Sequence, residues 1–191
     1  MILTLPNILT LSRIAVIPMI VALFFLETTT GQWIACALFS LASVTDFLDG
    51  YLARSRGQMS AFGMFLDPVA DKLLVASGLL MMAAFDQIAG TVLIPAVIIL
   101  CREILVSGLR EYLAEFAVSV PVSRLAKWKT AVQMIAIGLL ILGNESHPTI
   151  PETIPIQLIG EAGLWIAAII TLITGLDYLR TGLRHMGGSG K

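Results

Sequence analysis

Charged residues are scarce in this sequence. They account for 13% of its 191 residues, about half of the share of roughly 25% that soluble domains carry. Hydrophobic residues account for 57%, and the mean hydropathy is +0.90. So little charge argues against an ordinary soluble globular domain. The composition predicts a protein that folds in a lipid bilayer.

Cysteine is equally scarce, with two residues, Cys36 and Cys101. Both lie in apolar stretches and neither belongs to a CxxC motif, which argues against a disulfide framework and against a zinc site. A cleavable signal peptide is not expected either, because the first apolar run has no basic segment before it and no small-residue cleavage site after it. We expect that run to form the first membrane helix.

Long apolar runs are abundant. A helix needs about 20 mostly apolar residues to cross a hydrocarbon core of roughly 30 Å. Six stretches meet or approach this length: 8–26, 33–52, 67–85, 91–112, 129–143 and 158–179, the fifth being short unless it extends back toward Leu125. No repeat or linker divides them. The sequence predicts an all-α polytopic membrane protein with six transmembrane helices, forming one domain over residues 1–185 with a flexible tail over 186–191.

Basic residues are missing from alternate connections between these stretches. The connections near 27–32, 86–90 and 144–157 hold acidic residues but neither lysine nor arginine. The remaining connections and the tail hold Arg54, Arg56, Arg110, Arg124, Lys127, Lys129, Arg180, Arg184 and Lys191. Because lysine and arginine stay on the cytoplasmic side, both termini are predicted to be cytoplasmic.

Four aspartates lie where a membrane helix should have none. Asp46 and Asp49 fall in the cytoplasmic third of the second stretch, and Asp67 and Asp71 open the third from the same side. Helical spacing places each pair on one face of its helix. The short connection between the two helices makes these faces neighbours, so the sequence predicts one cluster of four carboxylates.

Such a cluster requires compensation. Each aspartate near the bilayer centre costs about 2.5–3.5 kcal/mol on insertion scales, and mutual repulsion adds to that cost. Magnesium and manganese prefer oxygen ligands and share carboxylates with phosphate groups, and two such metals can clamp a pyrophosphate. Gly50, Ala53 and Gly63 are small enough for a ligand to approach the backbone, and Arg54 offers a phosphate partner.

Other interpretations stay open at this point. The aspartates could cap helices or form ion pairs with Arg54, Arg56 and Lys72. Buried carboxylates also mark ion pathways in metal or proton-coupled transporters, although here they crowd at one end and no repeat of halves is visible. Membrane prenyltransferases also have Asp-rich helices, but need a larger bundle and a different spacing.

The same residues resemble the signature of the CDP-alcohol phosphatidyltransferase family, D-x2-D-G-x2-A-R-x8-G-x3-D-x3-D. It is complete here, with eight fixed positions in 26 residues: Asp46, Asp49, Gly50, Ala53, Arg54, Gly63, Asp67 and Asp71. The resemblance covers the whole chain and implies a six-helix membrane bundle. It also implies a homodimer in the bacterial inner membrane, with its active site on the cytoplasmic side.

The resemblance also implies roles for individual residues. The four aspartates of the cluster would bind two Mg²⁺ or Mn²⁺ ions, and Asp71 would act as general base on the acceptor hydroxyl. The CDP part of CDP-diacylglycerol would be contacted by Thr10, Gly50, Ala53, Arg54, Ser60 and Gly63. The hydroxyl would attack the lipid-bearing phosphorus and release CMP.

Further stretches resemble the branch of this family that uses glycerol 3-phosphate as acceptor: 6–10, 67–72, 102–112 and 127–130, the last preceded by Ala126 where glycine is expected. The product would then be phosphatidylglycerophosphate. Cardiolipin synthases and phosphatidylinositol-phosphate synthases share every signature residue, so these acceptors remain alternatives.

A dianionic acceptor needs a basic pocket. Arg110, Lys127 and Lys129 lie on the aspartate side and are the predicted phosphate ligands, although setting topology and contacting anionic lipid would also explain them. Helical spacing places Glu103, Ser107 and Arg110 on one face. Arg102 lies midway along its stretch, where we expect it to pair with Glu103 or Glu111. Nucleic acid is not an expected partner, because the basic loop is poor in aromatics and lies beside a membrane.

Overall fold

The computed structural model describes residues 5–56, 61–115, 124–143 and 154–188, and these residues form helices without any strand. The elements are α1 (Leu5–Phe24), α2 (Thr29–Arg56), α3 (Ala61–Ala84), the short 3₁₀ helix η1 (Gly90–Val92), α4 (Leu93–Glu115), α5 (Arg124–Ile141) and α6 (Ile156–Gly188). The all-α prediction is confirmed.

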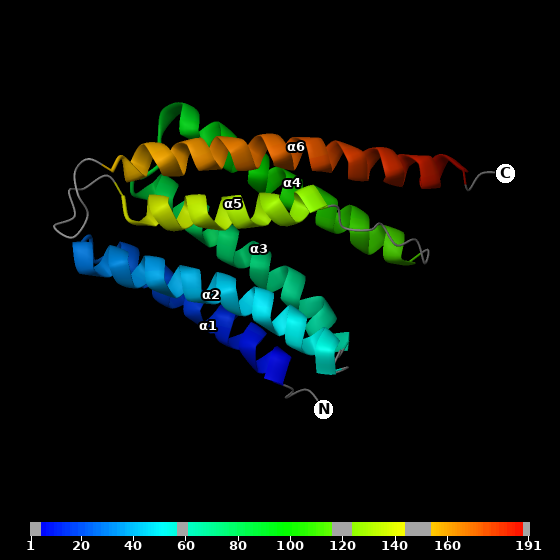
Figure 1. Cartoon of the computed structure of the whole chain (residues 1–191), viewed down its shortest axis with the longest axis horizontal. Helices are drawn as coiled ribbons and strands as arrows, with labels where there is room; N and C mark the ends of the chain where they lie inside the picture. Colours follow the sequence, from blue (N-terminus) through cyan, green and yellow to red (C-terminus); the bar gives the residue numbers. More distant parts are fainter. Residues whose placement is uncertain (1–4, 57–60, 116–123, 144–153, 189–191) are drawn as a thin grey trace.

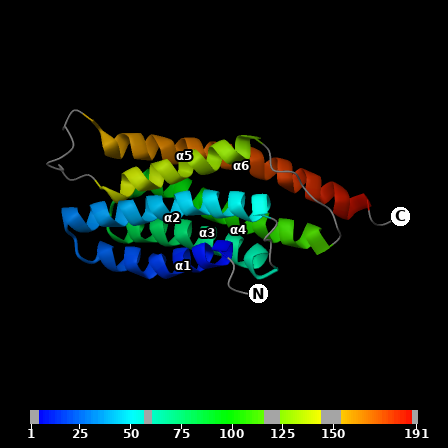
Figure 2. The same ribbon diagram turned by 60° about the horizontal axis from the view of Figure 1, so that its bottom comes forward.

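The helices form a bundle in which successive helices run in opposite directions (Figures 1 and 2). Helix α1 packs against both α2 and α3, while α6 packs against α5 and α4. Contacts of α5 with α2 and α3 join these two groups. Helix α1 begins and α6 ends at the same end of the bundle (Figure 1).

The centre of the bundle is apolar and closely packed. Phe39, Ile137 and Leu164 are completely buried. At Gly160 an added Cβ would lie 2.7 Å from the Cγ of Leu140, so α5 and α6 approach each other where α6 has no side chain. Such small-residue contacts are typical of helices that pack in lipid, where close van der Waals contact replaces the hydrophobic effect as the driving force.

The outside of the bundle is also apolar. Large side chains such as Leu80, Ile104 and Ile135 are about two-thirds exposed, at 67%, 68% and 64%. A water-soluble protein rarely exposes apolar side chains over so much of its surface. This surface fits a bilayer, and the chain is therefore a polytopic membrane protein.

Three helices are long and apolar enough to cross a membrane within the described residues, at Asn7–Phe24, Gly90–Ala114 and Ile156–Arg180. A shorter apolar helix covers Trp128–Ile141. Helix α3 does not qualify as a span by this measure because Asp67, Asp71 and Lys72 interrupt its first half. The sequence thus located all six helices, while the number of crossings and the cytoplasmic position of the termini stay predictions.

Two boundaries differ from the sequence-based ones. Helix α5 begins at Arg124, so the short fifth stretch does extend back past Leu125. Helix α6 continues to Gly188, three residues into the segment 186–191 that was expected to be a flexible tail. No residue in this segment interrupts a helix as proline would, and residues 189–191 lie outside the described structure.

Candidate active site

A cavity of about 480 Å³ lies among α2, α3, α4, α5 and α6, each of which contributes lining residues. Its lining includes most of the charged residues that the sequence singled out: Asp46, Asp67, Asp71, Lys72, Arg102, Glu103, Arg110, Glu111 and Lys129. The remaining lining residues are Pro68, Val106, Ser107, Ala114, Ala126, Thr130 and Tyr178. This cavity is the candidate active site.

Three of the four predicted carboxylates line this cavity together. Asp46 comes from α2, and Asp67 and Asp71 come from α3 one helical turn apart. The short connection between α2 and α3 brings them to one wall, as the sequence predicted. The side chain of Asp49 lies outside the described residues.

Two side chains of helix α1 donate hydrogen bonds to two of these carboxylates. Arg13 Nη1 donates to Asp46 Oδ1 at 2.5 Å, and Thr10 Oγ1 donates to Asp67 Oδ1. Both donors are buried, and they lie three residues apart, so one turn of α1 reaches α2 and α3 at once. Thr10 was expected beside the CDP group, and here it contacts a carboxylate that the signature assigns to metal.

Sequence reasoning missed Arg13. Its side chain is completely buried, at 0% exposure, in a helix that the sequence assigned to the membrane. An arginine inside an apolar stretch usually has a partner in the bundle interior, and this signal could have found it. Arg13 compensates part of the carboxylate charge, for which the sequence had suggested metal ions or ion pairs with Arg54, Arg56 and Lys72.

The donor set fits a hard divalent cation. Carboxylate oxygens are the ligands that magnesium and manganese prefer. Asp71 Oδ1 is buried and accepts no hydrogen bond from the described residues. A buried carboxylate oxygen without a partner is costly, and a cation or a substrate proton would satisfy it. Within the described part of the chain, however, no three acidic, histidine or cysteine side chains form a complete metal-binding group.

Basic side chains of α4 and α5 also line the cavity. Arg110 and Lys129, two of the three predicted phosphate ligands, line it together with Arg102. The predicted face of α4 is confirmed, because Glu103, Ser107 and Arg110 all border the cavity. The side chain of Lys127 lies outside the described residues.

Two of the basic side chains are tied to Glu103. Lys129 Nζ donates to Glu103 Oε1, and Arg102 Nη1 lies 3.9 Å from Glu103 Oε2. Arg102 also donates to Thr174 Oγ1 at 2.9 Å and lies over the ring of Tyr178, 5.8 Å from its centroid. Of the two partners expected for Arg102, Glu103 is the one with which the structure shows an ion pair.

Most residues predicted to contact the CDP group lie outside the described side chains: Gly50, Ala53, Arg54 and Ser60. Gly63 is described and is buried near the start of α3.

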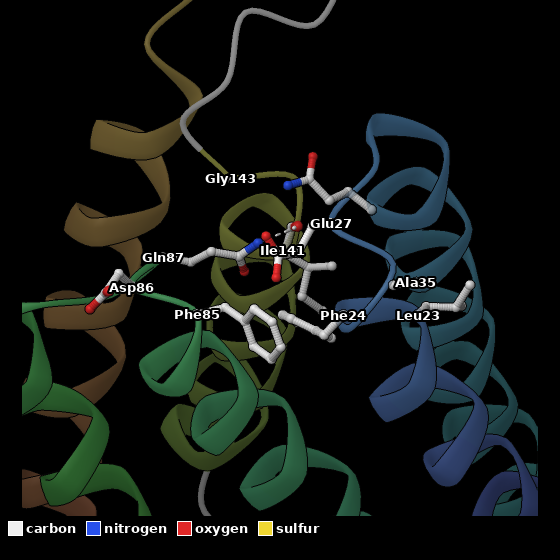
Figure 3. A pocket seen from close by; sticks show the side chains of 10 residues that line it. Leu23, Phe24, Glu27, Ala35, Phe85, Asp86, Gln87, Ile141 and Gly143 are labelled. Carbon is white, nitrogen blue, oxygen red and sulfur yellow. Dashed lines mark hydrogen bonds between the residues drawn. The ribbon is translucent and has the colours of Figure 1, made fainter.

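A second cavity of about 260 Å³ lies at the opposite end of the bundle. Glu27, Asp86 and Gln87 are among its lining residues, and Figure 3 shows Gln87 reaching toward Ile141, whose carbonyl accepts its amide at 3.4 Å. Of the predicted site residues whose side chains the structure describes, none borders this cavity. The described residues with predicted catalytic or binding roles therefore lie toward one end of the molecule.

Comparison with known proteins agrees with this arrangement. The sequence profile of CDP-alcohol phosphatidyltransferase matches residues 3–173. A CDP-diacylglycerol–glycerol-3-phosphate 3-phosphatidyltransferase of Rickettsia typhi is 48% identical over 92% of this chain and 95% of its own. The protein of the same name from Haemophilus influenzae is 40% identical, over 92% and 91%.

A solved structure shares the fold. The apo crystal structure of Mycobacterium tuberculosis phosphatidylinositol phosphate synthase superposes with a TM-score of 0.65, covering 94% of this chain and 88% of its own, at 20% sequence identity. The matching fold, the extent of the profile match and the identity to the relatives lead to one conclusion: the chain belongs to the CDP-alcohol phosphatidyltransferase family.

Proposed function

We propose that this protein transfers a phosphatidyl group from CDP-diacylglycerol to glycerol 3-phosphate, giving phosphatidylglycerophosphate and CMP. The observation that carries the proposal is one cavity whose lining combines aspartates of α2 and α3 with basic side chains of α4 and α5. Asp46, Asp67 and Asp71 face the side where a metal-bound pyrophosphate would lie, and Arg110 and Lys129 offer charge to a second phosphate group. The names of the bacterial relatives support glycerol 3-phosphate as the acceptor.

Asp71 is placed to act as the general base. Its buried Oδ1 accepts no hydrogen bond from described residues and can take the proton of the acceptor hydroxyl. The hydroxyl oxygen then forms a bond to the phosphorus that carries the lipid. The bond from that phosphorus to the oxygen shared with CMP breaks, and CMP leaves with the electron pair.

The four signature aspartates, Asp46, Asp49, Asp67 and Asp71, would hold Mg²⁺ or Mn²⁺ in a two-metal site. The metals would supply positive charge at the pyrophosphate, which stabilises the leaving oxygen. Arg13 and Thr10 orient Asp46 and Asp67 from α1, because each holds one carboxylate oxygen in place.

The remaining site residues bind the two substrates. Arg110, Lys127 and Lys129 bind the phosphate of the acceptor. The CDP group is contacted by Thr10, Gly50, Ala53, Arg54, Ser60 and Gly63. Because the basic connections lie at the same end as the cavity, the site opens to the cytoplasmic side of the bacterial inner membrane. The protein acts there as a homodimer among membrane lipids.

The test is a CMP-release assay on purified protein with CDP-diacylglycerol and Mn²⁺ or Mg²⁺. Glycerol 3-phosphate, inositol phosphate and phosphatidylglycerol are offered separately. We expect metal-dependent release with glycerol 3-phosphate alone. Release with another acceptor would keep the chemistry and overturn the acceptor, whereas no release with any of them would overturn the enzyme and favour ion transport.

A further inference from the structure

Glu103 lies between two cations inside the cavity. One of its oxygens accepts from Lys129 on α5, and the other lies 3.9 Å from Arg102 on its own helix. All three residues line the cavity. A carboxylate bridging two cations has the shape and charge sign of a small bound anion.

The two cations differ in how they are held. Arg102 is also fixed by Thr174 and by the ring of Tyr178, so it keeps its position when Glu103 moves. Lys129 is buried, at 4% exposure, and its described ion pair is with Glu103. A buried ammonium group needs an anionic partner, and Glu103 provides one when no substrate is bound.

We propose that Glu103 is a specificity-determining residue, whose carboxylate occupies the place of the acceptor's phosphate and yields it only to a more highly charged anion. This inference rests on the proposed function, since it concerns the acceptor site of that reaction. A phosphate monoester carries a charge of about −1.5 to −2 near neutral pH. It therefore outcompetes the single charge of Glu103 for Lys129 and Arg102. A phosphodiester carries one negative charge and gains no such advantage.

Competition from Glu103 lowers the affinity for every anion by the same factor, because the apparent dissociation constant rises as the fraction of molecules with a free subsite falls. A weakly bound diester then no longer fills the subsite at concentrations at which a monoester still does. Removing the charge of Glu103 should therefore tighten the binding of both anions and let the diester bind at those concentrations. If Glu103 only held Lys129 in place, its removal would weaken binding instead.

The experiment compares Glu103→Gln with Asp86→Asn. Glutamine keeps the size of the side chain and can still accept a hydrogen bond from Lys129. Asp86→Asn is the control because it removes the same charge from an exposed carboxylate at the other end of the bundle, outside the candidate active site. Thermal unfolding in detergent is measured with increasing inorganic phosphate and with dimethyl phosphate, and KM for glycerol 3-phosphate is measured by CMP release.

We expect Glu103→Gln to lower both KM and the phosphate concentration needed for half-maximal stabilisation by roughly five- to tenfold, with a smaller effect on kcat. Dimethyl phosphate should stabilise this variant and not the wild type. Asp86→Asn should shift each value by less than about twofold, because this exposed charge lies at the other end of the bundle. An unchanged or raised KM, or equal effects in both variants, would overturn the proposal.

The binding measurements separate this inference from the proposed function. If the wild type releases no CMP with glycerol 3-phosphate, the proposed reaction fails whatever the variants do. If the wild type is active and Glu103→Gln binds phosphate no more tightly, the role of Glu103 fails alone. Should Glu103→Gln not fold, Glu103→Asp keeps the charge and withdraws the carboxylate by one methylene, and it should also bind phosphate more tightly.

Discussion

At the scale of single residues, the site is a set of buried charges that compensate one another. Arg13 holds Asp46, and Lys129 holds Glu103. Asp71 differs because one of its oxygens is buried without a hydrogen-bond partner in the described structure. A protein retains such a group where a ligand or a reaction uses it. The unpaired oxygen is thus the strongest single indication of chemistry in the cavity.

Replacing Asp71 tests its role as base. We expect Asp71→Asn to reduce kcat for CMP release by about 10²- to 10⁴-fold, because the amide has the same shape but cannot take the proton. Asp86→Asn is the control, since this exposed carboxylate lies at the other end of the bundle and its φ of +54° suits asparagine. Equal kcat in wild type and Asp71→Asn would rule Asp71 out as the base.

Replacing Arg13 tests the compensation of charge. Arg13→Met should lower the free energy of unfolding by about 1–3 kcal/mol, because it leaves Asp46, whose side chain is 35% exposed, without its cation. Adding Asp46→Asn should recover part of this loss, since the unpaired charge is then also removed. Thermal unfolding of both single variants and the double variant in metal-free detergent gives the coupling. Strictly additive losses would show that the pair carries no interaction energy.

At the scale of helices, packing depends on where side chains are missing. Gly160 lets α6 approach Leu140 of α5, and Gly175 makes room for Arg102, whose Cγ would lie 3.1 Å from an added Cβ. Both contacts lie on α6, which packs against α5 and α4. The packing of α6 therefore affects the position of Arg102, which lines the cavity.

A matched pair of glycine variants tests this packing. We expect Gly160→Ala to lower the free energy of unfolding by about 1–3 kcal/mol relative to Gly108→Ala, because the new methyl group overlaps the buried Leu140. Gly108 also lies within a helix, but an added Cβ there meets nothing within 4 Å. Thermal unfolding in one detergent compares the two. Equal midpoints would show that α5 and α6 adjust without strain.

At the scale of the whole molecule, the bundle has two chemically different ends. One carries the aspartate cavity and the basic helix ends, and the other carries the smaller cavity with Glu27 and Asp86. A bilayer with lysine and arginine retained on its cytoplasmic side orients such a molecule in one way. In the proposed orientation, the cavity would face the cytoplasm and the soluble glycerol 3-phosphate there.

Cysteine labelling tests this orientation. In a background with Cys36→Ala and Cys101→Ala, we expect Asp86→Cys to react with a membrane-impermeant maleimide in spheroplasts. Glu111→Cys should react only after the membrane is permeabilised. Both positions are exposed, so a difference in reaction reports the side of the membrane. Labelling of Glu111→Cys in intact spheroplasts would reverse the proposed topology.

The sequence by itself determined the class of fold and indicated that aspartates of the second and third helices lie close together. Apolar runs located six helices because a bilayer demands length and hydrophobicity from each segment, independently of its neighbours. The spacing of Asp46, Asp67 and Asp71 was equally local, since one short connection brings their helix faces together. Both features can be predicted from helix geometry and from the helix that follows next in the sequence.

The tertiary structure alone decided which charges meet. Arg13 lies 33 residues from Asp46, and Lys129 lies 26 residues from Glu103. No sequence period connects such positions, because the pairing depends on how α1 lies against α2 and on how α4 and α5 both pack on α6. The stability of a buried charge depends on which partner it contacts and not on its spacing in the sequence. The ion pairs within the site could therefore be identified only from the packed helices.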